Sequence, residues 1–291
     1  MSKPPVTLEN YEQVYDYYEV HKQNQVAAWA SHTVLGSFMK PHVTSLHPET
    51  PEQIDSFLDE GYQVVLAANH QSDMDPPAIA SLTRHFSSFS RLEGNTFIPT
   101  KSGLFKNGIL RRIIDGLGAT PQYRTDDVGS KGNPLSDTVR KLRNTARDRS
   151  FTMARSKLQD QGQHLAIFPE KTRNLEDPSR VQKLGFGLGK IITNLNSDTK
   201  VVVVPVGLWF GNPEDNAKHQ SGQKAEKSGN KLQRIAGTIA RLYRQRKPYV
   251  VIGEPLVGPF NQPEEFYPQL ETGMQDCVDR GIELHEQALA A

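Results

Sequence analysis

The residues best suited to chemistry are a histidine and an aspartate that lie five positions apart, His70 and Asp75. They follow residues 64–68, an apolar run of strand length, and Pro76 and Pro77 come directly after them. Proline suits the first turn of a helix, so this pattern predicts a strand, a tight turn and then a helix. In such a turn the Asp75 carboxylate can reach the His70 imidazole, fix its tautomer and leave the second ring nitrogen as a general base.

Two other interpretations use the same residues. In a structural interpretation Asp75 only caps the helix and His70 only bonds the loop, since both residue types are common in turns. In a metal-site interpretation His70, Asp73 and Asp75 are ligands in a metal-dependent phosphohydrolase. That site would need further ligands, and no second histidine cluster follows another predicted strand to provide them.

The composition is that of a soluble globular protein: of 291 residues, 36% are hydrophobic and 23% are charged. The net charge of +1 argues against a nucleic-acid partner, and the single Cys277 excludes an internal disulfide. No apolar run reaches the roughly 20 residues of a membrane-spanning helix, and we expect no secretory signal. We therefore expect a reducing location, the cytoplasm or an organelle stroma, for a protein that is soluble or peripherally bound to a membrane.

The chain divides into an N-terminal helical segment, 1–60, and an α/β domain, 61–291. The N-terminal segment lacks strand patterning, and residues 11–38 predict two helices or one broken helix. A third, short helix is expected near the end of this segment. Its apolar side chains suit packing onto the main domain, and contact of Trp29 and Phe38 with a membrane is the alternative.

In the α/β domain, short apolar runs alternate with amphipathic stretches. The expected strands are 62–68, 95–100, 118–123, 163–168, 200–207 and 248–253. The expected helices are 76–85, 102–114, 135–160, 181–195, 231–245 and 263–289. This alternation predicts an α/β fold with a mostly parallel central sheet flanked by helices, and a functional site at the carboxyl ends of the strands.

Polar and basic side chains follow several of the predicted strands. Lys101 follows the second strand, Arg124 ends the third, and Glu170, Lys171 and Arg173 follow the fourth. Arginine binds phosphate through a planar fork of N–H groups and lysine binds it as a point charge. Because the carboxyl ends of parallel strands meet at one edge, these residues predict a site for a small phosphorylated compound whose hydroxyl group is deprotonated by the histidine.

Four motifs carry a resemblance to the glycerolipid acyltransferases. Asn-His-Gln-Ser-Asp-Met-Asp-Pro at 69–76 resembles the first signature of that family, His-x4-Asp, and looks especially like the soluble plastid and bacterial glycerol-3-phosphate acyltransferases. Phe-Pro-Glu-Lys-Thr-Arg at 168–173 resembles the third signature, with Lys171 in place of a glycine. Residues 118–124 resemble the second signature less closely, and residues 204–206, Val-Pro-Val, resemble the fourth.

The resemblance implies transfer of a fatty acyl group from acyl-CoA or acyl carrier protein to a hydroxyl of glycerol-3-phosphate or 1-acylglycerol-3-phosphate, in phospholipid biosynthesis. It implies that His70 is the general base, that Asp75 orients it, and that Glu170 lines the acceptor site. Four basic residues would bind the substrate phosphate: Arg173, Arg124, Lys101 and Lys171. We expect no metal and no cofactor besides the thioester co-substrate.

Two predicted helices, 135–160 and 231–245, carry dense clusters of lysine and arginine. Such clusters suit the phosphates of coenzyme A, the acidic surface of acyl carrier protein or an anionic membrane. The sequence does not choose between these partners. If the histidine and aspartate were only structural, the same helices would instead suggest a non-catalytic module that binds lipid head groups.

Overall fold

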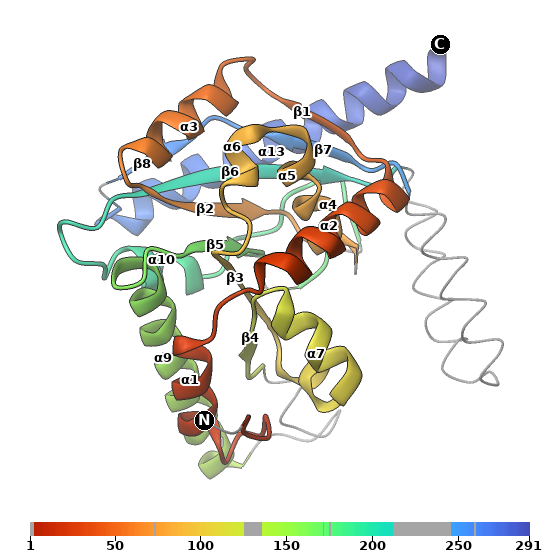
Figure 1. Cartoon of the computed structure of the whole chain (residues 1–291). Helices are drawn as coiled ribbons and strands as arrows, with labels where there is room; N and C mark the ends of the chain where they lie inside the picture. The colour runs from red at the N-terminus through yellow and green to blue at the C-terminus, as the bar shows by residue number, and fades with distance from the viewer. Residues whose placement is uncertain are drawn as a thin grey trace.

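A computed structural model describes residues 3–72, 74–124, 136–170, 172–174, 176–211, 246–258 and 260–291. Several sequence predictions lie outside these residues: Asp73, Lys171, and the helix expected over 231–245 with its basic cluster. The described residues form one sheet with helices on both faces (Figure 1), which confirms the predicted α/β class. None of the helices in the described ranges is both long and apolar enough to cross a membrane.

In the described part of the chain the sheet has eight strands. Seven of them lie in the order β1-β7-β6-β2-β5-β3-β4, and β8 pairs with the N-terminal part of β6, at Val202 and Val203. Their bounds are β1 (His42–Ser45), β2 (Gln63–Ala68), β3 (Thr96–Lys101), β4 (Ala119–Gln122), β5 (His164–Ile167), β6 (Val201–Trp209), β7 (Tyr249–Ile252) and β8 (Leu256–Val257). The five strands from β6 to β4 in this order are parallel. Their carboxyl ends therefore share one edge of the sheet, whereas β7 and β8 run antiparallel to β6.

The central strands β2 and β6 are apolar because both of their faces are covered. Every residue of β6 is buried, as are five of the six residues of β2. Strands covered on both faces are typically near-continuous runs of valine, isoleucine and leucine. Along β2, Val64 and Leu66 contribute to one apolar core, while Val65 and Ala67 contribute to a second core on the opposite face.

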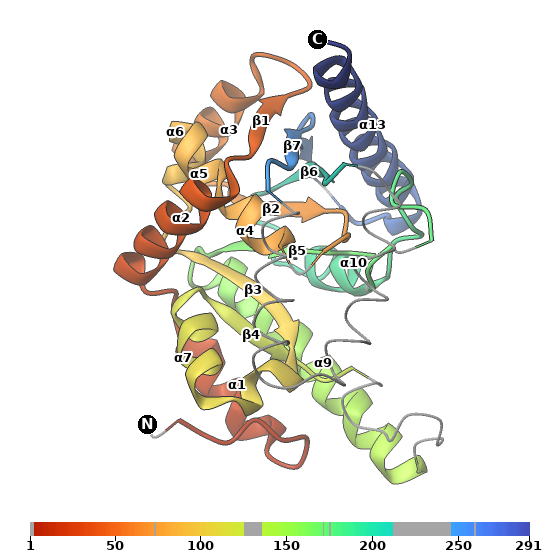
Figure 2. The same cartoon turned by 90° about the vertical axis from the view of Figure 1, so that its right-hand side faces the viewer.

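Two groups of helices cover these cores (Figure 2). The first group is α2 (Gln25–Met39), α3 (Thr50–Asp59), α4 (Asp75–Ala80), α5 (Leu82–His85) and α6 (Ser87–Ser90). The second group is α9 (Asp137–Gln159), α10 (Gly187–Ile192) and α13 (Pro263–Ala290). The loop after β2 leads directly into α4, so the start of α4 lies at the carboxyl end of that strand.

The N-terminal segment contains three helices, as predicted: α1 (Tyr11–Val20), α2 and α3. It also contains β1, which the sequence analysis did not expect and which pairs in parallel with β7 at the edge of the sheet. All four residues of β1 are at least partly exposed. A strand that is so short and so little buried produces no run of apolar residues to recognise.

The helix expected over 102–114 is divided into two. A 3-10 helix, η1 (Ser102–Lys106), is followed by α7 (Gly108–Gly116). Asn107 separates them, and its side-chain oxygen accepts N–H groups from the first turn of α7 at 3.0 and 3.1 Å. The break is therefore an N-terminal cap, which fixes where α7 begins relative to the end of β3.

Candidate active site

The imidazole of His70 and the carboxylate of Asp75 are hydrogen-bonded, with 2.6 Å between Nδ1 and Oδ2. We call this pair the dyad. Asp75 begins α4 and its side chain is fully buried, whereas the His70 side chain, in the loop after β2, is 16% exposed. An ionised carboxylate can only accept hydrogen bonds, so Nδ1 carries the proton and Nε2 is left as a proton acceptor.

The backbone of the dyad loop also binds Asp75. The N–H groups of Gln71 and Ser72 donate to its carboxylate at 2.7 and 3.0 Å. Burial raises the pKa of Asp75, and the hydrogen bonds from His70, Ser72 and Gln71 act in the opposite direction. All three N–H groups donate to the oxygens of this carboxylate. Hydrogen bonds of this kind hold the side chain in place and favour its ionised form.

Glu170 holds the other side of the same loop. Its Oε2 accepts the backbone N–H of His70 at 2.7 Å, and its Oε1 accepts the backbone N–H of Gln182 at 2.7 Å. Burial raises the pKa of this carboxyl to about 7, against the effect of these two hydrogen bonds. The resemblance assigned Glu170 to the acceptor site, but both of its oxygens bind backbone N–H groups, one of them in the dyad loop.

The loop after β5 wraps around the dyad loop. The N–H of Asn174 donates to the carbonyl oxygen of His70 at 2.8 Å, and the Gln71 side-chain amide donates to the carbonyl of Pro178 at 2.7 Å. Arg173 directly precedes Asn174 and is half-buried, so its backbone lies beside the dyad loop. The sequence analysis did not single out Gln71 or Asn174, because only the folded loop shows what their polar groups bind.

Lys101 and Arg124 lie at the same edge of the sheet but farther from the dyad. Lys101 ends β3, the neighbour of β5, and Arg124 follows β4, the next strand. With about 4.8 Å between strands, β4 lies about 14 Å from β2 across the sheet. Moreover, β3 pairs with β5 only at Thr96 and Phe97, so the two strands separate before their carboxyl ends.

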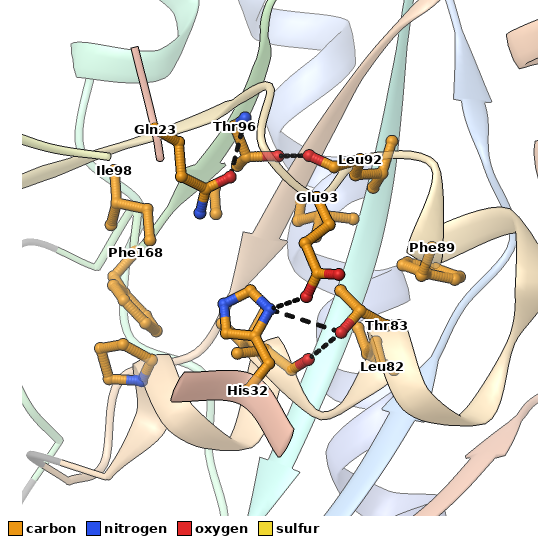
Figure 3. A pocket seen from close by; sticks show the side chains of 15 residues that line it. Gln23, His32, Leu82, Thr83, Phe89, Leu92, Glu93, Thr96, Ile98 and Phe168 are labelled. Carbon is orange, nitrogen blue, oxygen red and sulfur yellow. Dashed lines mark hydrogen bonds and ion pairs between the residues drawn. The ribbon is translucent and has the colours of Figure 1, made fainter. Parts of the chain in front are cut away.

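A pocket lies on the inner side of Phe168, the residue after β5 (Figure 3). The ring of Phe168 stacks on the ring of His70, with 4.7 Å between centroids and 29° between planes. The cavity itself has about 50 Å³ of free space, and about 510 Å³ of empty volume when its opening to solvent is counted. Most of its wall is apolar, from Leu66, Pro76, Ile79, Leu82, Phe89 and Ile98. We call it the Phe168 pocket; it lies next to the dyad because one residue, Phe168, touches both.

Within the described residues, no group of three or more His, Cys, Asp or Glu side chains is placed to hold a metal ion. The metal-site interpretation included Asp73, which lies outside that part of the chain. Cys277 is buried in α13, where a Cβ atom on Gly207 of β6 would meet it, and burial raises the pKa of its thiol. Its thiol lies 3.9 Å from the carbonyl oxygen of Pro205 in β6.

A comparison with curated proteins finds no significant match for this sequence. A family model described as Acyltransferase matches residues 48–209, which is more than half of the chain. The matched region runs from α3 to the end of β6 and includes the dyad, Glu170 and Arg173. The chain therefore belongs to the acyltransferase family, the family of the glycerolipid acyltransferases.

Proposed function

We propose that the protein transfers a fatty acyl group from acyl-CoA or acyl carrier protein to a hydroxyl of glycerol-3-phosphate or 1-acylglycerol-3-phosphate, as a step of phospholipid biosynthesis. One observation carries the proposal. His70 donates from Nδ1 to the buried Asp75 carboxylate at 2.6 Å, at the carboxyl end of β2, and keeps Nε2 as a base. This is the arrangement that deprotonation of a hydroxyl nucleophile requires.

In the proposed reaction, Nε2 of His70 takes the proton of the acceptor hydroxyl while the oxygen attacks the thioester carbonyl carbon. The new C–O bond forms and the C–S bond then breaks. The imidazolium returns the proton to the departing thiolate, so the products are an ester and a free thiol. Asp75 keeps the imidazole in the required tautomer and stabilises its cationic form, as the buried aspartate does in hydrolase triads.

The acceptor phosphate is proposed to bind to Arg173, Arg124, Lys101 and Lys171. The position of Arg173 supports this role most directly, because the next residue, Asn174, is hydrogen-bonded to the dyad loop. Lys101 and Arg124 end or follow the adjoining strands at the same edge. A guanidinium group gives a phosphate two parallel hydrogen bonds, so we expect Arg173 to contribute most to acceptor binding.

The acyl chain is proposed to bind in the Phe168 pocket. Its apolar lining suits a hydrocarbon chain, and Phe168 joins the pocket to the dyad. A chain that enters beside Phe168 would leave its thioester carbonyl next to His70. Burial of apolar surface in a concave site of this kind is the usual source of affinity for such ligands.

Membrane contact is proposed through exposed apolar residues of α2, η1 and α7. We call them the α2–α7 surface: Val26, Trp29, Val34, Phe38, Leu104, Ile109 and Ile113. Figures 1 and 2 show α2 and α7 side by side, and the N–H of Asn24 donates to the carbonyl of Gly116 at 3.0 Å. Residues 25–40 and 102–116 contain Lys and Arg and one acidic residue, Asp115, which is buried and paired with Arg111. The exposed charges of this surface therefore suit an anionic bilayer.

The proposed function is tested by acyl transfer to labelled glycerol-3-phosphate, with palmitoyl and oleoyl thioesters of coenzyme A and of acyl carrier protein as donors. Lysophosphatidate is assayed in parallel, and every reaction is repeated with a metal chelator. We expect chelator-resistant product from the wild type and at least about a hundredfold less from His70→Ala, because loss of a general base typically lowers rates by about 10²–10⁴.

His47→Ala is the matched control, since His47 is exposed and precedes α3, outside the site. It should have wild-type activity. Absence of product with both acceptors and both donors, from protein shown to be folded, would reject the proposal. Release of inorganic phosphate from glycerol-3-phosphate that stops with the chelator would support the metal-dependent phosphohydrolase instead.

A further inference from the structure

One wall of the Phe168 pocket is polar. It includes His32, from α2, with Thr83 and Glu93, and the side chains of His32 and Glu93 meet with 2.6 Å between Nδ1 and Oε1. Arg84 donates from Nη2 to the same oxygen of Glu93 at 2.6 Å. His32 is 8% exposed, so this imidazole is almost completely enclosed by the protein. A buried polar group in an otherwise apolar pocket calls for a partner on the ligand.

The arrangement fixes the state of the His32 ring. Its Nδ1 carries the proton, because the Glu93 carboxylate can only accept. Within the described part of the chain, all hydrogen bonds of this ring involve Nδ1. Burial lowers the pKa of His32 below its ordinary value, so the ring is neutral at pH 7. Its Nε2 is therefore a hydrogen-bond acceptor, and Figure 3 shows that edge of the ring directed across the pocket toward Ile98 and Phe168.

We propose that His32 selects acyl groups that carry a hydroxyl on the part of the chain lying against this wall, so that hydroxyacyl thioesters are preferred donors. The inference rests on the proposed function, because it assumes that the acyl chain occupies the Phe168 pocket. An acyl chain without a hydroxyl would cover Nε2 of His32 with methylene groups, and this nitrogen would then be a buried acceptor without a donor. A hydroxyl at that point would donate to Nε2, which should favour the hydroxylated chain by about tenfold.

The test compares kcat/KM for acyl-CoA donors of one chain length, with no hydroxyl or with a hydroxyl near the carbonyl, in mid-chain or at the terminal carbon. In the wild type we expect one of these positions to exceed the plain donor by about tenfold. In His32→Leu the ratio should fall to about one, whereas His32→Gln, which keeps an acceptor, should retain part of it. No preference at any position, or a preference that persists in His32→Leu, would overturn the inference.

Thr83→Val is the matched control. Thr83 belongs to the same wall, but its hydroxyl already donates to the carbonyl oxygen of Ala80 at 2.8 Å. The substitution keeps the volume of the side chain, so the hydroxyl preference should be unchanged. Loss of the preference in Thr83→Val as well would show that the Thr83 hydroxyl, and not the His32 acceptor alone, determines it, and would overturn the inference.

A binding measurement separates this inference from the proposed function. Hexadecanoate and its hydroxylated isomers are titrated into the wild type and into His32→Leu by calorimetry, which requires no turnover. Tighter binding of one hydroxylated isomer to the wild type alone would support the role of His32 even if acyl transfer failed. Acyl transfer without any difference between the isomers would support the proposed function and overturn the inference.

Discussion

The carboxylate of Glu170 accepts the backbone N–H of His70 at 2.7 Å, while the imidazole of His70 bonds to Asp75. The backbone and the side chain of His70 are thus held by two different carboxylates. Glu170 comes from the loop after β5 and Asp75 from the start of α4. The position of the imidazole therefore depends on the neighbouring strand as well as on the helix that follows it.

Glu170→Gln is expected to lower kcat by about tenfold while KM for the acceptor changes little. The amide has one acceptor oxygen, so either His70 or Gln182 loses the partner of its N–H group. Steady-state kinetics measure kcat and KM separately and so check this prediction. Glu176→Gln, an exposed residue of the same loop, is the control and should have wild-type kinetics. A rise in KM equal to the fall in kcat would instead support the acceptor-site role that the family resemblance implies.

Asp75→Asn is expected to reduce kcat by about 10⁴ with the fold retained, by analogy with the same change in hydrolase triads. Three N–H groups point at this carboxylate, and an amide NH₂ would face at least one of them. The imidazole would then lose its fixed tautomer. Rates and circular dichroism of the variant check the prediction, with the exposed Asp198→Asn as control. Activity within tenfold of the wild type would contradict the dyad mechanism.

The sequence was sufficient to predict the parallel sheet and the contact of the dyad, because local patterns encode both. The valine-rich runs of β2 and β6 are apolar on both faces, and the turn between β2 and α4 is short. The edge strands β1 and β8 were missed, since they are short and partly exposed. Short edge strands lack the apolar runs on which sequence-based recognition depends.

The contacts of the site that were missed are those between residues far apart in the chain. Glu170 lies 100 residues after His70 and binds its backbone, which leaves no trace in side-chain patterns. His32 meets Glu93 across 61 residues, from a segment expected to pack against the domain or to contact a membrane. Such pairs become visible only when the order of the strands and the packing of the helices on the sheet are known.

Gly207→Ala is expected to destabilise the protein by about 3 kcal/mol, at the upper end of the usual cost of overpacking. A Cβ atom at Gly207 would overlap the backbone carbonyl carbon of Cys277, so β6 and α13 would have to separate. Urea unfolding measures the change. Gly36→Ala is the control: nothing lies within 4 Å of its Cβ position in α2. That substitution should stabilise the helix by about 0.5–1 kcal/mol.

Substitutions on the α2–α7 surface are expected to weaken binding to vesicles that contain anionic lipid. Val26→Glu and Ile109→Glu each remove a side chain that is 75% exposed and add a negative charge. Each substitution removes one aliphatic side chain that would be buried in the bilayer, so the partition coefficient of the protein between vesicles and water should fall about tenfold. Vesicle sedimentation checks this, with Leu289→Glu, at the end of α13 and 76% exposed, as control. Equal binding of all three variants and the wild type would exclude this surface as the membrane contact.

Stability should depend on pH through His164, which lies at the start of β5. Its Nδ1 accepts the N–H of Val64 at 3.0 Å, and burial lowers its pKa to about 4. Above pH 6.5 the ring is neutral in both the folded and the unfolded chain, so its full contribution is present. As pH falls from 6.5 toward 4, the unfolded chain binds the proton more readily, and stability is lost by up to about 3 kcal/mol.

His164→Asn keeps an acceptor for Val64 but does not titrate, so it isolates this effect. Glu170 acts in the opposite direction, because its raised pKa of about 7 makes stability fall as pH rises from 4.5 to 7. The comparison is therefore between the two proteins at each pH. Between pH 7 and pH 4.5, the free energy of unfolding measured with urea should change in favour of the variant by about 2 kcal/mol. A difference that is independent of pH would show that the imidazole at position 164 binds its proton equally well in the folded and the unfolded chain.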